Sequence, residues 1–168
     1  MSGLLSRQQF GVRPRVGVVV LTMGQRPGDL SRAIKSLLAQ QLVVLDVVVV
    51  GNGWRPEFLP GGVRGLHLAE NVGIPAGRNA GAATVSGDFL FFLDDDAELA
   101  DPLFLAEGIR KFEADSSLGL LQPRITDPTG KETPRRWIPR LRKGEATYSS
   151  YVFSVLEAAV FIPTRVFE

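Results

Sequence analysis

The sequence predicts an α/β domain built on a mostly parallel sheet, with helices covering both faces. Short continuous runs rich in β-branched residues, at 16–21 and 43–50, are typical of strands buried on both faces of a sheet. Stretches with apolar residues at helical spacing alternate with such runs, as they do in parallel α/β sheets. The length of 168 residues, with 45% hydrophobic and 22% charged residues, suits one globular domain with a single core.

The first part of the chain predicts a strand, a helix and two further strands. We expect the first strand at 16–21, and Pro27 opens the helix because its fixed φ suits a first helical position. We expect the second strand at 43–50, ended by Gly51-Asn52-Gly53, and a shorter third strand at 63–68. The apolar face of the helix consists of Leu30, Ala33, Ile34, Leu37 and Leu38.

The alternation continues as far as residue 122. An Ala- and Gly-rich helix is predicted at 75–86, and an apolar strand at 88–93 leads into an acidic triplet. A helix is expected from about residue 102 to 114, and a further strand at 118–122. Residues 126–147 are polar, basic and marked by proline and glycine, which is typical of a loop.

The ends of the chain predict its domain boundaries. We expect an N-terminal extension over residues 1–15 and one domain over residues 16–168. Residues 148–167 are apolar again, and the chain stops at Glu168 without a polar tail or a closing element. We interpret this ending as a truncation of the domain on its C-terminal side.

Charge and cysteine content narrow the function classes. The formal net charge is +1, so no overall field favours nucleic acid or a membrane. The chain has no cysteine, which excludes disulfides and thiolate metal sites. Residues 1–15 lack the apolar core of a signal peptide, and the longest apolar run, 42–50, is interrupted by Asp46 and too short for a membrane span. We therefore expect a cytoplasmic protein without a nucleic-acid partner.

The acidic triplet Asp94-Asp95-Asp96 directly follows the apolar strand. Ligands of open α/β sheets bind at the carboxyl ends of the strands, which is where this triplet falls. Alternation along an extended strand predicts Asp94 and Asp96 on one side and Asp95 on the other. Two carboxylates with a phosphorylated ligand suit Mg²⁺ or Mn²⁺. The alternative is a solvated turn whose aspartates cap the next helix.

A segment of small residues, 71–81, precedes that strand. Its glycines and alanines let backbone approach a ligand closely, and a helix N-terminus near Pro75 favours anionic groups. Arg78 is a strong cation within the segment and can hold a phosphate or a base carbonyl. The alternative is that the small residues allow tight helix–sheet packing, with Arg78 solvated.

Four segments stand in a diagnostic order: VGVVVLTMGQRPGDLSRAIKSLLAQ, DVVVVGNG, NVGIPAGRNAGAATVSGDFLFFLDDD and EAAVFIPTRVFE. In order and spacing they resemble family 2 glycosyltransferases over residues 16–168. The third segment is similar to the family's most specific stretch, which runs from Asn-x-Gly through Arg-Asn to an Asp-x-Asp motif. The resemblance implies a Rossmann-like GT-A fold, with the nucleotide-binding half and the start of the acceptor half present.

The resemblance also implies roles for individual residues. Asp94 would contact the ribose and Asp96 would bind the divalent cation on the donor diphosphate, with Asp95 between them in the nucleotide site. Thr22 falls where the first strand meets the nucleotide, and Arg78 falls beside the base and the diphosphate. The implied donor is a nucleoside-diphosphate sugar, the implied cofactor is Mg²⁺ or Mn²⁺, and the implied acceptor is a saccharide or a lipid-linked molecule.

Two positions depart from the family's pattern. An acidic residue that reads the base usually follows the second strand, whereas this chain has Gly51 there, which leaves Asn52 as the nearest polar candidate. An aromatic residue often follows the first threonine, and here it is Met23. The family inverts the anomeric carbon with a carboxylate base that lies downstream, and Glu157 does not match the motif of that base. We assign no catalytic base, and we expect this chain to bind donor without transferring its sugar.

Three further features have a functional and a structural interpretation. Residues 134–143 gather several cations around Trp137, and they either meet an anionic acceptor or the inner face of the membrane, or form a solvated loop. His67 lies inside a predicted strand, and we expect it to be structural. Trp54 follows the second strand and either stacks on a base or covers the sheet edge.

Two other functions share parts of this pattern. A phosphatase of the haloacid-dehalogenase type also ends a strand in Asp-x-Asp, but it expects threonine or valine where this chain has Glu98, and an acidic pair downstream. A non-catalytic nucleotide-binding domain would keep the site without turnover. Hydrolysis of an aryl phosphate would favour the first alternative, and nucleotide binding without turnover would favour the second.

Overall fold

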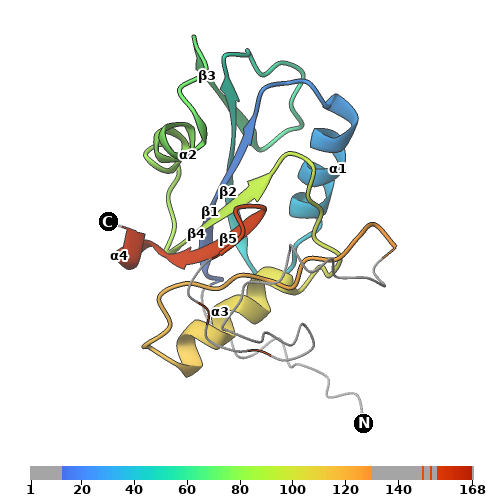
Figure 1. Cartoon of the computed structure of the whole chain (residues 1–168). Coiled ribbons are helices and arrows are strands. Elements are labelled where there is room, and N and C mark those ends of the chain that lie inside the picture. Colours follow the sequence, from blue (N-terminus) through green and yellow to red (C-terminus); the bar gives the residue numbers. More distant parts are fainter. Residues whose placement is uncertain (1–12, 130–148, 150–151, 153–154, 168) are drawn as a thin grey trace.

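The computed structural model describes residues 13–129, 149, 152 and 155–167 (Figure 1). The strands are β1 (Arg15–Thr22), β2 (Val44–Asn52), β3 (Val63–Leu68), β4 (Phe89–Asp94) and β5 (Ala159–Pro163). The helices are α1 (Pro27–Leu38), α2 (Ile74–Ala82), α3 (Phe104–Ala114) and the short α4 (Thr164–Phe167). Within these described residues the strands form one sheet, in the order β3-β2-β1-β4-β5.

The sheet is mostly parallel, as the sequence predicts. β1 pairs in parallel with β2 and with β4, β2 pairs in parallel with β3, and only β5 runs antiparallel, against β4. From β1 the chain builds outward through β2 and β3, and then crosses back to lay β4 on the other side of β1. The carboxyl ends of β1 and β4 therefore flank the point at which strand order reverses, where open α/β sheets bind ligands.

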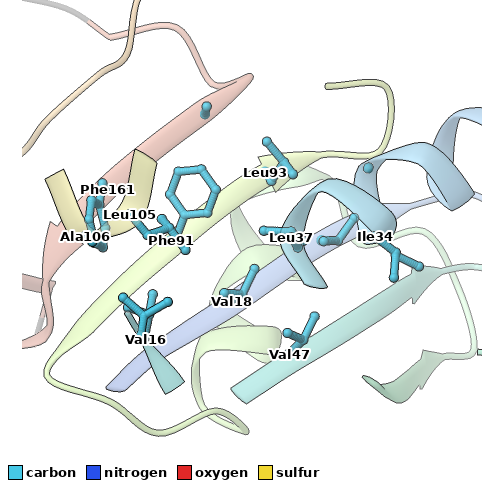
Figure 2. Close-up of a cluster of buried hydrophobic side chains, with 14 of the residues drawn as sticks. Val16, Val18, Ile34, Leu37, Val47, Phe91, Leu93, Leu105, Ala106 and Phe161 are labelled. Atoms are coloured by element: carbon cyan, nitrogen blue, oxygen red, sulfur yellow. The ribbon is translucent and has the colours of Figure 1, made fainter. Parts of the chain in front are cut away.

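Helices cover both faces of the sheet, which confirms the predicted α/β architecture. α1 and α3 lie on one face and α2 on the other (Figure 1). Figure 2 shows Leu37 of α1 and Leu105 of α3 among the buried side chains of the first face, together with Val18 and Phe91 of the sheet. Val19 of β1 points to the opposite face, so β1 is buried on both sides, as a continuous apolar run predicts.

α2 packs against the sheet through glycine. A Cβ added at Gly81 would lie 2.5 Å from Cγ1 of Val19, and one added at Gly77 would lie 2.6 Å from Cδ1 of Leu21. These distances leave no room for a side chain on that face of the helix. The small residues of the 71–81 segment therefore allow close helix–sheet packing, as the structural alternative predicts, but Arg78 is not solvated as that alternative expects, since its side chain is 13% exposed.

Three predicted details differ from the structure. The helix predicted at 75–86 ends at Ala82, because the Thr84 hydroxyl donates to Gly81 O and Ser86 bonds to the Asp46 carboxylate. The strand predicted at 118–122 is reduced to one antiparallel bridge between Leu121 and Phe161. Leu38 ends α1 and is 44% exposed, outside the buried face on which it was predicted.

Some predictions concern residues outside this description. The basic segment 134–143 lies outside the described residues, as does most of the predicted extension 1–15. Among the residues that the structure describes, no helix is both long and apolar enough to cross a membrane.

Candidate functional site

The buried polar side chains of the described part of the chain gather at one edge of the sheet. They are Thr22, Asn52 and Asp95, which are 3%, 4% and 7% exposed. Thr22 ends β1, Asn52 ends β2, and Asp95 follows β4. The parallel register places Thr22 opposite Gly51, so the ends of β1 and β2 are level. Because burial of polar groups is costly unless they are bonded, such a concentration marks a candidate site.

Asp95 is held from two sides. The Thr22 hydroxyl donates to Asp95 Oδ2 at 2.6 Å, and Arg26 Nη2 donates to Asp95 Oδ1 at 2.8 Å. The Thr22 oxygen in turn accepts a hydrogen bond from Gly24 N at 3.0 Å. Thr22 and Asp95, both predicted to contact a nucleotide, therefore bind each other. Their hydrogen bond joins the β1–α1 loop to the end of β4.

The alternation predicted for the triplet is wrong at Asp96, which shares Arg26 with Asp95, whereas Asp94 binds Arg78. β4 ends at Asp94, and Ala97 N donates to Asp94 O at 3.2 Å, which closes a turn. Asp95 and Asp96 are in that turn rather than in an extended strand, so the two-residue period no longer applies to them. Arg26 binds the carboxylates of both Asp95 and Asp96. The side chain of Asp96 remains 43% exposed, whereas that of Asp95 is 9% exposed.

Arg26 is a site residue that the sequence pattern does not single out. It precedes Pro27 at the start of α1, and its guanidinium reaches the triplet from the β1–α1 loop. The charges of Asp95 and Asp96 raise the pKa of Arg26 above its usual value. Its position could have indicated this role, because the loop that follows β1 lies at the same edge of the sheet as the triplet.

Asp94 is paired with the second arginine of the site. Arg78 Nη2 donates to Asp94 Oδ1 at 2.7 Å and to the backbone oxygen of Glu157 at 2.6 Å. The Arg78 side chain is only 13% exposed, and its guanidinium carbon lies 5.9 Å from the centre of the Phe92 ring. Arg78 therefore ties α2 to β4 and to the segment that enters β5. The Glu157 carboxylate lies 3.6 Å from Arg78 Nη1 and is 60% exposed.

The protonation of Asp94 reflects this partly buried position. Burial raises the pKa of the Asp94 carboxyl, and the neighbouring charges of Asp96 and Asp95 raise it further. The charge and hydrogen bond of Arg78 lower it, but the net shift is upward. Arg78 therefore offsets part of the effect of burial and of the neighbouring carboxylates on Asp94.

Asn52 holds the loop that enters α2. Its Nδ2 donates to Asn71 Oδ1 at 2.8 Å and to Gly73 O at 3.3 Å, and its Oδ1 accepts from Val72 N at 2.9 Å. The amide of Asn71 also reaches Met23 Sδ at 3.1 Å. The position predicted to read a base is thus occupied by a side chain that clamps three successive residues of the neighbouring loop.

The structure leaves no room for a side chain at Gly51, the position where the resemblance implies an acidic residue. A Cβ at Gly51 would lie 2.0 Å from the backbone oxygen of Trp54, closer than any side chain tolerates. The Trp54 indole packs on Gly24, where an added Cβ would lie 2.4 Å from the ring. Trp54 therefore covers the sheet edge and anchors the β1–α1 loop. His67 is exposed on β3, with Nδ1 3.0 Å from Trp54 O.

The donor set of the edge fits a hard divalent cation bound together with a phosphorylated ligand. Among the described residues no group of three or more His, Cys, Asp or Glu side chains is arranged to hold a metal by itself. Mg²⁺ usually binds through one or two carboxylates and completes its shell with water and substrate phosphates. Asp96 supplies an exposed carboxylate of this kind.

Comparison with protein families identifies one matching model. The model for glycosyl transferase family 2 matches residues 18–157. No curated protein sequence matches the chain.

Solved structures similar to this chain share its fold at low sequence identity. A mannosyltransferase, PcManGT from Pyrobaculum calidifontis in complex with GDP-Man and Mn²⁺, has a TM-score of 0.64 at 16% identity, over 92% of this chain and 46% of that one. S. aureus TarS 1-349 in complex with UDP has a TM-score of 0.65 at 18% identity, over 87% of this chain and 46% of that one. This chain therefore spans less than half the length of these structures, whose likeness shows the GT-A fold.

Proposed function

The chain belongs to glycosyl transferase family 2, and on that premise we propose that its sheet edge binds a nucleoside-diphosphate sugar together with Mg²⁺ or Mn²⁺. The observation that carries the proposal is the gathering of Thr22, Asn52 and Asp95, all buried, beside the exposed carboxylate of Asp96 at the switch point of the sheet. Structures of the same fold hold GDP-Man with Mn²⁺ in one case and UDP in another, which supports this class of donor.

We assign some of these residues to direct contact with the ligands and the others to holding the site in shape. Asp96 would hold the cation, because its carboxylate is the most exposed of the triplet. Asp94 would accept hydrogen bonds from the hydroxyl groups of the ribose. Asp95 with Thr22 would frame the site, and Asn52 would shape it by holding the 71–73 loop. Arg78 would act through Asp94, because its guanidinium is already committed to that carboxylate.

The reaction we propose is an inverting transfer of the sugar to a saccharide or lipid-linked acceptor. The acceptor hydroxyl loses its proton to a carboxylate and attacks the anomeric carbon, while the bond from that carbon to the diphosphate oxygen breaks. A bound divalent cation would neutralise the charge that develops on the departing diphosphate. Among the described residues we assign no carboxylate as the base.

Family membership sets aside a phosphatase of the haloacid-dehalogenase type. A non-catalytic nucleotide-binding domain would use the same edge and differs only in turnover. An assay of sugar transfer distinguishes the two functions.

Calorimetry tests donor binding. UDP, GDP and dTDP would each be titrated into the chain with and without Mn²⁺, and at least one is expected to bind in a metal-dependent way. Asp96→Asn should weaken that binding by at least about tenfold, since even residues that only orient a metal ligand contribute 10–100-fold. Glu98→Gln is the matched control, because Glu98 is an exposed carboxylate nearby that pairs with Arg32. Binding of none of the three nucleotides with metal would refute the proposal.

We also propose a cytoplasmic location, with contact between residues 134–143 and an anionic acceptor or the membrane surface. This segment lies outside the described residues, so the proposal rests on its charge alone. Co-sedimentation with vesicles containing anionic lipid tests it. Equal sedimentation of the natural chain and of a variant with Arg135, Arg136 and Arg140 replaced by glutamine would contradict membrane contact.

A further inference from the structure

Arg26 already holds the place of a cation at the acidic triplet. One arm of its guanidinium, Nη2, binds Asp95, and the other, Nη1, binds Asp96 Oδ2. A planar guanidinium matches carboxylate oxygens with two donors at once, which makes such contacts stronger than those of a point charge. Arg26 thus neutralises the carboxylate that we assign to the metal.

The other two carboxylates cannot take over as an open metal ligand. Asp95 is buried and already accepts the Thr22 hydroxyl as well as Arg26. Asp94 is committed to Arg78. Each member of the triplet therefore has an arginine partner, and a divalent cation bound at Asp96 would compete with Arg26.

Arg26 is the partner that can be displaced. Its side chain is 52% exposed, whereas that of Arg78 is 13% exposed. The backbone of its loop is anchored, because Gly24 N bonds to Thr22 and the Trp54 indole packs on Gly24. The guanidinium can therefore leave Asp96 without unfolding of the loop, while Asp95 keeps its hydrogen bond from the Thr22 hydroxyl.

We propose that Arg26 is a built-in counter-cation, which occupies Asp96 in the free protein and passes to the donor diphosphate when the metal takes Asp96. The inference rests on the proposed function, since it concerns the same site. Metal alone binds weakly, because it must break the Arg26–Asp96 pair without offering the guanidinium a new partner. Metal and donor diphosphate together supply that partner, since phosphate oxygens accept the same two-pronged contact. The two ligands therefore bind with positive coupling.

The first test measures metal binding without nucleotide, by the electron paramagnetic resonance signal of free Mn²⁺. Arg26→Gln should bind Mn²⁺ about threefold to fivefold more tightly than the natural chain, the upper end being set by the loss of a partly exposed ion pair. Arg32→Gln is the matched control: Arg32 lies on α1, is also about half exposed, and pairs with Asp29 and Glu98 instead of the triplet. It should change Mn²⁺ affinity by less than about twofold, because its ion pairs are with Asp29 and Glu98 and an exposed charge is screened by salt. Equal affinity in the natural chain and Arg26→Gln would overturn the proposal.

The second test measures nucleotide binding at saturating Mn²⁺, by calorimetry with whichever of UDP, GDP or dTDP the natural chain binds. Here Arg26→Gln should bind about tenfold or more weakly, since a charge-assisted contact to phosphate is lost. The same substitution thus acts in opposite directions on metal alone and on nucleotide with metal. A loss in both measurements, with an unchanged circular dichroism spectrum, would overturn the counter-cation role. If the natural chain binds none of the nucleotides, it is the proposed function that fails, and the first test still decides whether Arg26 competes with metal.

Discussion

Asp95 shows how a single buried charge organises the candidate site. Its carboxylate is 9% exposed and would be costly to bury without partners. The Thr22 hydroxyl and the Arg26 guanidinium supply them, from the end of β1 and from the loop that follows. The structural role of Asp95 is therefore to hold β1, its loop and β4 together, while the side chain of Asp96 remains more exposed.

This pairing predicts a coupled loss of stability. Asp95→Asn and Thr22→Val should each lower the free energy of unfolding by about 1–3 kcal/mol, because each leaves a buried polar group with a poorer partner. The double variant should lose about 0.5–3 kcal/mol less than the sum of the two single losses, since the two residues share one hydrogen bond. Urea unfolding of the four proteins measures this coupling. Strict additivity would show that the Thr22–Asp95 hydrogen bond does not contribute to stability.

At the scale of elements, α2 is held close to the sheet by the absence of side chains. Gly77 and Gly81 face β1 and β2, and this closeness brings Arg78 within reach of Asp94. The helix thus gives up helix propensity, which glycine lowers by about 1 kcal/mol relative to alanine. In exchange it places the second arginine of the site.

Replacing these glycines with alanine should therefore destabilise the chain, although alanine has the higher helix propensity. Gly81→Ala should destabilise the chain by about 1–3 kcal/mol, because the added Cβ would lie 2.5 Å from Val19 and overpack the core. Gly28→Ala in α1 is the control, since the nearest atom to its added Cβ is Arg32 Nη1 at 3.9 Å. That variant should gain up to about 1 kcal/mol. Thermal or urea unfolding distinguishes the two, and a neutral Gly81→Ala would contradict the close packing.

Asp46 joins three strands at the opposite end of the sheet. It lies in β2, its carboxylate accepts Arg64 Nη2 of β3 at 2.7 Å, and it also binds the backbone N–H and hydroxyl of Ser86 before β4. Burial would raise the pKa of Asp46, but the hydrogen bonds from Arg64 and Ser86 outweigh it and lower the pKa below its usual 3.8. Asp46 thus stabilises the fold in its charged form.

The sign of that shift predicts a pH dependence. A carboxyl whose pKa is lowered by folding contributes stability above its unfolded pKa, and the contribution is lost as pH falls through the folded pKa. Asp46→Asn should therefore lower the free energy of unfolding by about 1–3 kcal/mol near pH 7. The difference from the natural chain should shrink below pH 3.8. Urea unfolding between pH 7 and 3 measures it, and a difference that stays constant with pH would contradict the role of the charge.

At the scale of the whole molecule, the reversal of strand order brings the residues of the candidate site to one edge of the sheet. Among the described residues we assign neither contacts to an acceptor nor a catalytic base. A base typically contributes about 10²–10⁴-fold to such a transfer. Holding the acceptor in place can be worth still more. This chain spans less than half the length of the solved structures of its fold.

We therefore expect this chain to bind donor but to transfer its sugar far below ordinary enzymatic rates of about 1–10³ per second. Slow hydrolysis of the donor by water is expected, because a bound cation can still stabilise the departing diphosphate. A radiolabelled donor offered to lipid and saccharide acceptors measures both. Transfer at ordinary rates would instead point to Glu157 or another residue of this chain as the base.

The sequence by itself determined the class of fold and the position of the site along the chain. Continuous apolar runs and helical periodicity are local properties, so they predicted β1, β2, β4 and the helices between them. The triplet after an apolar strand predicted the ligand-binding edge, because carboxyl ends of parallel strands share one edge. The order of motifs was sufficient to indicate the family before any contact was known.

Only the tertiary structure decided which side chains meet at that edge. The end of β4 at Asp94 places Asp95 in a turn, where strand alternation no longer predicts direction. Arg26 and Asp95 are 69 positions apart, and no local pattern relates them. The Trp54 carbonyl leaves no room for a side chain at Gly51. Such pairings depend on how segments that are distant in the sequence pack together, and local sequence patterns do not predict that packing.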